Sequence, residues 1–411
     1  MASDGWRIDQ ECPQCGGPVT LDETDRVLAC PYCRVRLYIA ADGLFRYVLP
    51  ARSQDVDGRL LIPYWRVKGQ VFSCVPFEVM AGVIDMTRRA VDFPGLPSSL
   101  GVRPQAMKLR FATTETNRAF VRAQTSPAEA VANCERLYND LNDLVVFDQA
   151  FIGETVSLVY LPITTKGAIY DAVVDRKIAP LPAEGIDRSA LIDRSAAVDI
   201  RFVPTLCPHC GWDLEAERDS LVLLCQHCQS AWQAKGLGLQ RTAFGVLGGD
   251  FKPDRYLPFW RTKPLIEGVT LRSYADLVRF ANLPKILRDA WEKQELILWT
   301  PAFKVHPRNL LGIAKTLTIA QPSEEIAEHL PKAAYHPVNL PPAESVECIK
   351  VLLADFARPK QAFFPRLGDV SVGVAERKLV FVPFQEIGGE IRHPDHRICI
   401  SRNLLEYGRN L

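Results

Sequence analysis

Two copies of one cysteine pattern restrict what this chain can fold into more than any other feature of its sequence. Each copy holds two Cys-x-x-Cys pairs with 14 residues between them. A pair with this spacing presents two sulfurs from one tight turn, and the segment between the pairs is long enough to bring all four sulfurs around one ion. Zn²⁺ is the ion that such sets bind. The predicted ligands are Cys12, Cys15, Cys30 and Cys33 for one site and Cys207, Cys210, Cys225 and Cys228 for the other.

Both predicted zinc sites are structural. Four thiolates complete the tetrahedral shell of the ion, so no position stays open for a water that could be activated. The formal net charge of the chain is +1 with neutral thiols. Each site adds four thiolates and one Zn²⁺, which moves the total to about −3. A chain with this charge balance lacks the electrostatic footprint of a protein that binds nucleic acid along its length.

The composition predicts a soluble, cytoplasmic protein. The chain has 411 residues, of which 47% are hydrophobic and 24% charged, enough for several domains with substantial cores. No stretch approaches the roughly 18 to 20 apolar residues of a membrane-spanning helix, and Met1 to Gln10 lacks the layout of a secretion signal. The cysteines outside the two patterns are scattered, which indicates a reducing compartment and buried apolar roles. These are Cys74, Cys134, Cys348 and Cys399.

The second half of the sequence repeats the first. Cys12 matches Cys207 at an offset of 195, and the segment 61–68 matches 256–263 at the same offset, including a shared Trp-Arg-x-Lys motif. Further matches follow in the same order with offsets that only grow, which predicts a duplicated domain whose second copy gained short insertions. They pair 102–104 with 305–307, 127–131 with 342–346, and 158–162 with 379–383.

Each copy is predicted to be a four-cysteine zinc ribbon followed by a mostly antiparallel sheet with helices packed on one side, an α+β fold built twice. Strands rich in aromatic and branched residues are expected over 60–67 and 70–75, with Gly69 at the turn. Ser126, Pro127 and Glu129 form a capping-box start for a helix, and its counterpart runs from about Pro342 to Phe356. Further strands are predicted at 156–161, 168–174, 378–382 and 397–400, and a short hairpin at 19–21 and 27–29 around the turn 22–25.

The predicted domains follow from this order. They are a first zinc ribbon over 1–47, a first α+β domain over 48–180, a linker over 181–200, a second ribbon over 201–240 and a second α+β domain over 241–411. The linker repeats Ile-Asp-Arg-Ser-Ala and could be flexible or a short helix pair.

The knuckles resemble the zinc-ribbon (rubredoxin-like) superfamily. Cys12-Pro-Gln-Cys15-Gly16 and Cys207-Pro-His-Cys210-Gly211 carry its Cys-Pro-x-Cys-Gly form. In that form the proline stiffens the turn and the glycine lets amide N–H groups point at the sulfurs. The second knuckles depart from it, with Arg34 after Cys33 and Gln229 after Cys228. The resemblance covers about 35 residues in each half and implies metal binding, with little implied about activity.

The remaining notable residues favour structural roles. The Trp-Arg-x-Lys motif makes Arg66, Lys68, Arg261 and Lys263 a possible interaction surface, through base stacking and phosphate contact if the partner is nucleic acid. On a strand Trp65 is expected to point to the core and Arg66 outward, and the favoured alternative is a structural role in which the basic residues pack across the domain's own interface. The segment His393-Pro-Asp-His396 is interpreted as a loop without metal. His209 and His227 are expected to be exposed knuckle residues, because four thiolates already satisfy the ion.

Three functional hypotheses remain open at the level of the sequence. The first is a non-enzymatic interaction, scaffold or adaptor protein that binds protein partners in a cytoplasmic, bacterial assembly, since two similar surfaces on one chain suit bivalent docking. The second is a nucleic-acid-associated zinc-ribbon factor, although residues 6–40 hold four basic and five acidic side chains. The third is an enzyme with its site between the repeats. No catalytic residues are assigned, since no phosphate loop, dinucleotide fingerprint or nucleophile elbow is present.

Overall fold

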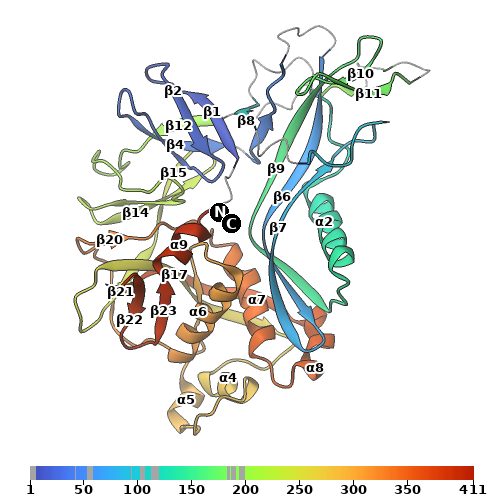
Figure 1. The fold of residues 1–411 in the computed structure, drawn as a ribbon. Helices are drawn as coiled ribbons and strands as arrows, with labels where there is room; N and C mark the ends of the chain where they lie inside the picture. The colour runs from blue at the N-terminus through green and yellow to red at the C-terminus, as the bar shows by residue number, and fades with distance from the viewer. Residues whose placement is uncertain are drawn as a thin grey trace.

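The computed structural model describes residues 6–41, 43–52, 59–93, 95–101, 107–112, 120–182, 186, 191–193 and 200–411. The fold is mixed α+β, and long strands run from top to bottom along the right side of the view in Figure 1. Two features of the sequence lie outside the described residues: most of the predicted linker 181–200 and the matched segment 102–104. Within the described residues, no helix has both the length and the apolar character needed to cross a membrane.

The first half is organised around a 17-residue strand, β6 (Arg59–Val75). It pairs antiparallel with β7 (Glu78–Arg89) on one side and β9 (Asp148–Thr164) on the other. The predicted turn at Gly69 is wrong, because Gly69 lies inside β6 opposite Ile84 of β7. The irregularity lies in β9 instead, where Gly153 has φ +68° and the register to β6 shifts between Lys68 and Gln70. A bulge in the partner strand lets β6 continue. The same sheet contains β5 (Arg46–Val48), β8 (Lys108–Phe111), β10 (Ala168–Asp171) and β11 (Arg176–Pro180).

The predicted helix of the first half is α2 (Pro127–Asn142). The capping box at its start is confirmed: the Ser126 hydroxyl accepts from the Glu129 N–H, and the Glu129 carboxylate accepts from the Ser126 N–H. These two bonds satisfy amide groups that have no partner within the helix. The helix packs on β6 and β7, and its residue Cys134 is buried against these strands.

The second half is organised around a long antiparallel pair, β17 (Arg255–Glu267) and β21 (Ser371–Ile387). The expected second helix is confirmed as α7 (Glu344–Phe356), which packs beside α6 (Pro307–Ala320). The other strands here are β16 (Phe244–Leu247), β18 (Leu298–Pro301), β19 (Ile326–Ala327), β20 (Ala334–Tyr335), β22 (Glu390–His393) and β23 (Ile398–Ser401). The other helices are α4 (Tyr274–Phe280), α5 (Asp289–Lys293), α8 (Lys360–Phe363), the 3₁₀ turn η2 (Phe364–Asp369) and α9 (Arg402–Gly408).

The two long pairs share one register. Trp65 of β6 lies opposite Leu158 of β9, and Trp260 of β17 lies opposite Leu379 of β21. These are the positions that the repeats in the sequence align. A short parallel strand joins each pair at that point, β5 beside β9 and β16 beside β21. The indole hydrogen bonds also correspond, since Trp65 Nε1 donates to the Thr125 carbonyl (3.0 Å) and Trp260 Nε1 to the Leu340 carbonyl (3.1 Å).

The two halves pack into each other. Phe72 and Ile152 of the first half lie in one apolar cluster with Phe259 and Phe303 of the second. Helix α7 contacts both β21 of its own half and β9 of the other, and Figure 1 shows it between the two sheets. Polar contacts reinforce this interface: the Gln70 amide donates to the Val305 carbonyl at 2.9 Å, and Lys350 pairs with Asp148 at 3.1 Å.

The ribbon segments contain short antiparallel strands. The hairpin expected between 19–21 and 27–29 is wrong, because β2 (Pro18–Asp22) pairs with β1 (Arg7–Glu11), while β3 (Val27–Ala29) pairs with β4 (Arg36–Ala41). The turn after β2 carries the chain from one sheet to another, and the N–H groups of Arg26 and Val27 donate there to the carbonyl of Arg218. In the second ribbon segment the strands are β12 (Ile200–Pro204), β13 (Val222–Cys225), β14 (Ser230–Lys235) and β15 (Gly238–Thr242).

Candidate metal centres and central cavity

The eight predicted ligands lie in two clusters of four. In each cluster the sulfur atoms all lie within 4.8 Å of one another, which is close enough to hold a metal ion. A tetrahedral Zn²⁺ with bonds of about 2.3 Å requires sulfurs about 3.8 Å apart. The distances fit this requirement: 3.8 Å for Cys12–Cys33, 3.7 Å for Cys15–Cys30, and 3.6 Å for both Cys207–Cys228 and Cys210–Cys225.

All four knuckles turn in the same way. Gly16 and Gly211 follow the first knuckle of each site with φ of +71° and +74°, where glycine carries no steric cost. Arg34 and Gln229 follow the second knuckles and also adopt positive φ, +62° and +54°. Non-glycine residues hold this conformation only where their surroundings impose it. The second knuckles therefore keep the turn geometry of the first knuckles, although Arg34 and Gln229 replace glycine there.

Backbone N–H groups favour the thiolate form of one cysteine in each cluster, whereas burial and the neighbouring sulfurs raise the pKa of Cys33 and of Cys225 to about 12. The N–H groups of Cys33 and Tyr32 lower the pKa of Cys30 to about 6. Burial raises the pKa of Cys207, but the N–H groups of Cys210 and His209 outweigh it and bring the pKa to about 6. Thiolate is the form that binds a metal ion. The chain thus provides the donor set that Zn²⁺ requires.

The two clusters belong to ribbons that pack against each other. Val27 and Tyr38 from the first ribbon share an apolar cluster with Leu223 and Trp232 from the second. Strand β12, which leads into the second ribbon, pairs antiparallel with β4 of the first. Figure 1 shows β4, β12, β14 and β15 gathered on one side of the molecule. A metal ion in either cluster would therefore stabilise a joint unit.

Arg66 and Lys68 are buried. They are 2% and 9% exposed, and both donate to the carboxylate of Glu23 in the first ribbon. The Arg66 guanidinium also lies 3.5 Å from the Trp6 ring centroid and donates to Asp85. The expectation that Arg66 points outward is corrected here. Arg66 lies on the face of β6 opposite to Trp65, but the first ribbon covers that face.

The equivalent residues of the second half are partly exposed. Arg261 lies 3.8 Å from Glu376, and Lys263 Nζ donates to Glu295 at 2.5 Å. The four basic residues of the two motifs thus have carboxylate partners, and the structure does not bring them together as one surface.

The histidine segment 393–396 begins at the last residue of β22 and continues into the turn that leads to β23. His393 Nδ1 accepts from the N–H groups of Asp395 and His396, both at 3.2 Å, so the neutral ring carries its proton on Nε2. A protonated nitrogen has no lone pair for a metal ion. His209 and His227 are exposed, and His227 stacks on Trp212 with ring centroids 4.9 Å apart.

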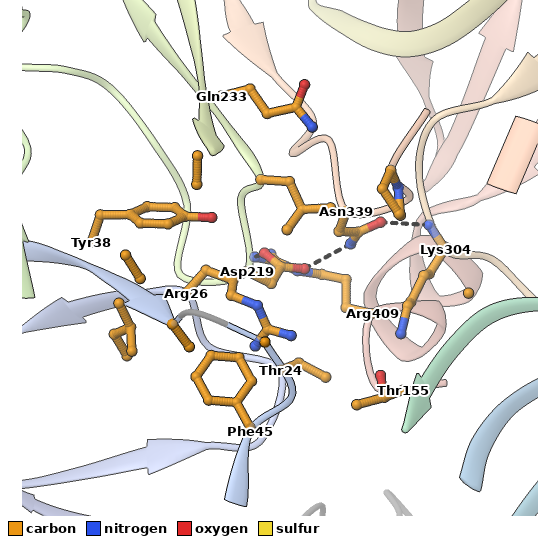
Figure 2. A pocket seen from close by; sticks show the side chains of 18 of the residues that line it. Thr24, Arg26, Tyr38, Phe45, Thr155, Asp219, Gln233, Lys304, Asn339 and Arg409 are labelled. Atoms are coloured by element: carbon orange, nitrogen blue, oxygen red, sulfur yellow. Dashed lines mark hydrogen bonds and ion pairs between the residues drawn. The ribbon is translucent and has the colours of Figure 1, made fainter. Parts of the chain in front are cut away.

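A cavity of about 350 Å³ lies between the two ribbons and the second half. Figure 2 shows Arg26, Lys304, Asp219, Asn339 and Arg409 around it. Asp219 is buried and accepts from Asn339 Nδ2 (2.7 Å) and Arg409 Nε (3.0 Å), which hold its pKa below its ordinary value although burial raises it. No sequence motif contains these residues, because segments far apart in the chain bring them together.

The ligand clusters show that the chain could be stabilised by zinc, and the cavity shows where polar groups from both halves converge. Comparisons with protein-family models, with curated proteins and with solved structures found no match to this chain.

Proposed function

We propose that the chain is a zinc-stabilised, non-enzymatic interaction protein, a scaffold or adaptor in a bacterial cytoplasmic assembly. We further infer that it arose by duplication, which the common register of β6–β9 and β17–β21 supports. The two four-cysteine sites hold structural zinc, and the long sheet of the first half presents a docking surface for a protein partner.

A cluster of exposed apolar side chains carries this proposal. It lies where the β6–β7 hairpin turns and α2 ends, and we name it the hairpin-end cluster. Three of its members are strongly exposed, at 69 to 73%. Exposed apolar side chains at one end of a sheet are costly in water and mark interaction sites. The cluster comprises Phe77 and Met80 from the hairpin, Leu141 from α2, and Val145 and Phe147 from the segment that follows it.

Hydrogen bonds hold the two parts of the hairpin-end cluster together. The Phe147 N–H donates to the Cys74 carbonyl at 2.9 Å, which places the segment after α2 beside the end of β6. Gln149 Nε2 donates to the Ser73 hydroxyl at 2.7 Å, and Asn139 of α2 donates to Gln149 at 3.1 Å. The apolar side chains are therefore displayed on a scaffold that is already ordered.

Acidic side chains border the hairpin-end cluster and indicate the chemistry of its partner. Glu78 is exposed beside Phe77, and Asp140 and Asp143 are exposed at the end of α2. Apolar anchors surrounded by carboxylates complement a partner segment that carries apolar and basic residues.

The central cavity and the charge distribution weigh against the two other functions. Among the described residues, Asp219 is the acidic side chain that lines the cavity. Its carboxylate accepts hydrogen bonds from Arg409 and Asn339. This leaves it poorly placed as a general acid or base. Nucleic-acid binding is disfavoured because Arg66 and Lys68 form ion pairs with Glu23.

Affinity capture from the native host tests the proposal. The triple variant Phe77→Ser, Leu141→Ser and Val145→Ser should lose its co-purifying protein while keeping two zinc ions per chain. The matched control is Ile286→Ser with Leu287→Ser, since these are also exposed apolar residues, 91% and 44%, but lie between α4 and α5. Equal capture by both variants, or recovery of nucleic acid that added salt releases, would overturn the proposal.

A further inference from the structure

We propose that the partner of the hairpin-end cluster binds as an extended strand, which pairs with the edge of β7 that faces away from β6. We name this the open edge. The inference rests on the proposed function and adds the form and the chemistry of the partner, a segment that alternates apolar and basic residues. The open edge adjoins the hairpin-end cluster, because Phe77 precedes β7 and Met80 belongs to it.

The main-chain groups of β7 point in turn towards β6 and towards the open edge. The Ala90 N–H donates to the Pro63 carbonyl on the β6 side, and the Arg89 N–H donates to the Ser98 carbonyl on the other side, both at 2.9 Å. The register between β6 and β7 shows no shift along the whole of β7. Since neighbouring residues of a strand direct their N–H and C=O groups to opposite sides, the odd-numbered residues from 79 to 85 direct theirs to the open edge.

The open edge has no main-chain partner over the segment 78–86, as far as the described residues show. Val83 lies in this segment and is 43% exposed, so the edge is accessible. Towards the C-terminal end of β7 the chain covers its own edge, because the Thr87 hydroxyl accepts from the Leu100 N–H at 2.9 Å. The accessible length therefore begins at the hairpin-end cluster and ends before Thr87.

The two faces of β7 are already covered by side-chain packing. Val79 and Ala81 pack against the apolar core of the second half, and Ile84 packs with Cys134 of α2. The groups that remain for a partner are thus the N–H and C=O groups of the open edge. Main-chain groups of this kind bind an extended strand, which supplies complementary donors and acceptors at the same spacing.

Strand β7 lacks the features that usually protect an edge strand. It has 12 residues, whereas the edge strands β2 and β11 of the same sheet have five each. Proteins keep edge strands from pairing by making them short or by placing bulges, prolines or lysines in them. The sequence of β7 contains neither proline nor lysine, and its register contains no bulge. Such an edge pairs readily with a strand of another chain.

The charge of the open edge favours a basic partner over a second copy of this chain. Within 78–86 the charged residues are Glu78 and Asp85, and the side chain of Asp85 stays 34% exposed although it pairs with Arg66. A second copy would place two acidic segments side by side with no basic residue in either, and like charges on paired strands are destabilising. Basic side chains on the added strand would instead pair with these carboxylates.

Binding of synthetic peptides to the full chain tests this mode of docking. The probe is a fluorescent peptide of alternating valine and lysine, as long as the segment 78–86, and it should bind. A peptide of alternating valine and glutamate should not bind, because its charge matches that of the edge. An analogue of the probe with methylated backbone nitrogens keeps the side chains and loses the N–H donors, so it should not bind either. Failure of the probe to bind, or equal binding of the methylated analogue, would overturn the inference.

Val83→Pro removes one N–H from the open edge. Proline is tolerated in an edge strand where the lost N–H makes no bond within the sheet. The variant should keep the zinc content of the native chain and bind the valine–lysine probe at least about tenfold more weakly. Binding as tight as that of the native chain would refute pairing at this edge.

Thr20→Pro is the matched control, in the edge strand β2. The Cys12 N–H donates to the Gly17 carbonyl between β1 and β2, so by alternation the Thr20 N–H points away from β1. The substitution therefore removes an outward N–H from a different edge of the same sheet. It should leave binding of the probe unchanged, and an equal loss in both variants would overturn the assignment to β7.

Amide exchange in the native chain provides a readout that needs no substitution. In the free protein the odd-numbered amides from 79 to 85 should exchange faster than the even-numbered ones, which bond to β6. The valine–lysine probe should slow the odd-numbered set. Unchanged exchange of that set in the presence of saturating probe would place the peptide elsewhere and refute strand addition.

Affinity capture from the native host separates this inference from the proposed function. Loss of the host protein in both the hairpin-end variant and Val83→Pro, with capture kept by Thr20→Pro, is the expected result. If the hairpin-end variant loses the host protein and Val83→Pro keeps it, the docking surface is supported and strand addition is refuted. If neither variant loses it, both proposals are refuted. A dimer of the chain that ultracentrifugation detects and Val83→Pro abolishes would assign the open edge to a second copy and overturn the inference.

Discussion

At the scale of single residues, Glu23 is the group on which the buried charges of the first half depend. It is 8% exposed and receives hydrogen bonds from both Arg66 and Lys68. Burial raises its pKa, but these two cations outweigh burial and hold the pKa below its ordinary value. Glu23 thus helps two cations to stay charged inside the protein, with Asp85 as a second partner of Arg66.

Replacing Glu23 by glutamine should lower the free energy of unfolding by about 3 to 5 kcal/mol, because two buried cations lose their common partner. Urea unfolding at pH 7 measures this loss. Since the folded pKa of Glu23 is lowered, its contribution is present above the unfolded value of 4.5 and disappears as the pH falls through the folded value, so the native chain and Glu23→Gln should converge in acid. Glu78→Gln, at an exposed position, is the control and should change little.

At the scale of elements, the two ribbons are joined by a strand pairing and by a common apolar core. Strand β4 pairs with β12, and residues such as Val27 and Trp232 share one core. The sequence alone predicts that replacing Cys12 and Cys15 by serine releases one zinc ion and loosens only the first ribbon. The shared strand pairing and core imply that the second ribbon loses part of its support too.

The variant Cys12→Ser with Cys15→Ser should therefore lose one of two zinc ions per chain and show faster amide exchange in β13 and β14 of the second ribbon. Elemental analysis and hydrogen exchange measure the two effects. The exposed Cys399, replaced by serine, is the control and should keep both ions. Unchanged metal content in the double variant would contradict the ligand assignment, and unchanged exchange in β13 and β14 would show that the ribbons fold independently.

At the scale of the whole molecule, the two halves share their interior. Phe72 from β6 is fully buried, and it lies in the cluster that contains Phe259 and Phe303 of the second half. Most of the length of β6 and β9 contributes to the first half. The C-terminal end of β6 and the N-terminal end of β9 pack into the core of the second half. Each half therefore buries part of its apolar surface only against the other.

Replacing Phe72 by alanine should lower the free energy of unfolding by about 3 to 5 kcal/mol through the cavity it leaves. Both halves should be affected together, so fluorescence and circular dichroism should report one coincident transition at a lower denaturant concentration. The control is Phe77→Ala, at the turn of the same hairpin and 72% exposed, which should leave stability nearly unchanged. Two separate transitions for Phe72→Ala would show that the halves unfold independently.

The sequence predicted those features that depend on neighbouring residues. The cysteine clusters follow from knuckle spacing, and α2 from its capping box, because both involve contacts between residues a few positions apart. The turn predicted at Gly69 is wrong, because a glycine between two strand-like segments is typical of a turn but also of a strand that lies opposite a bulge. Only the partner strand β9 distinguishes the two outcomes.

The sequence by itself determined where metal could be held. The tertiary structure alone decided that Arg66 and Lys68 are enclosed against Glu23, and that Arg26 and Lys304 face one cavity. The reason is physical: a thiolate set forms from nearby residues whatever the rest of the chain does, whereas the cost of a buried charge depends on groups that only long-range packing brings within reach.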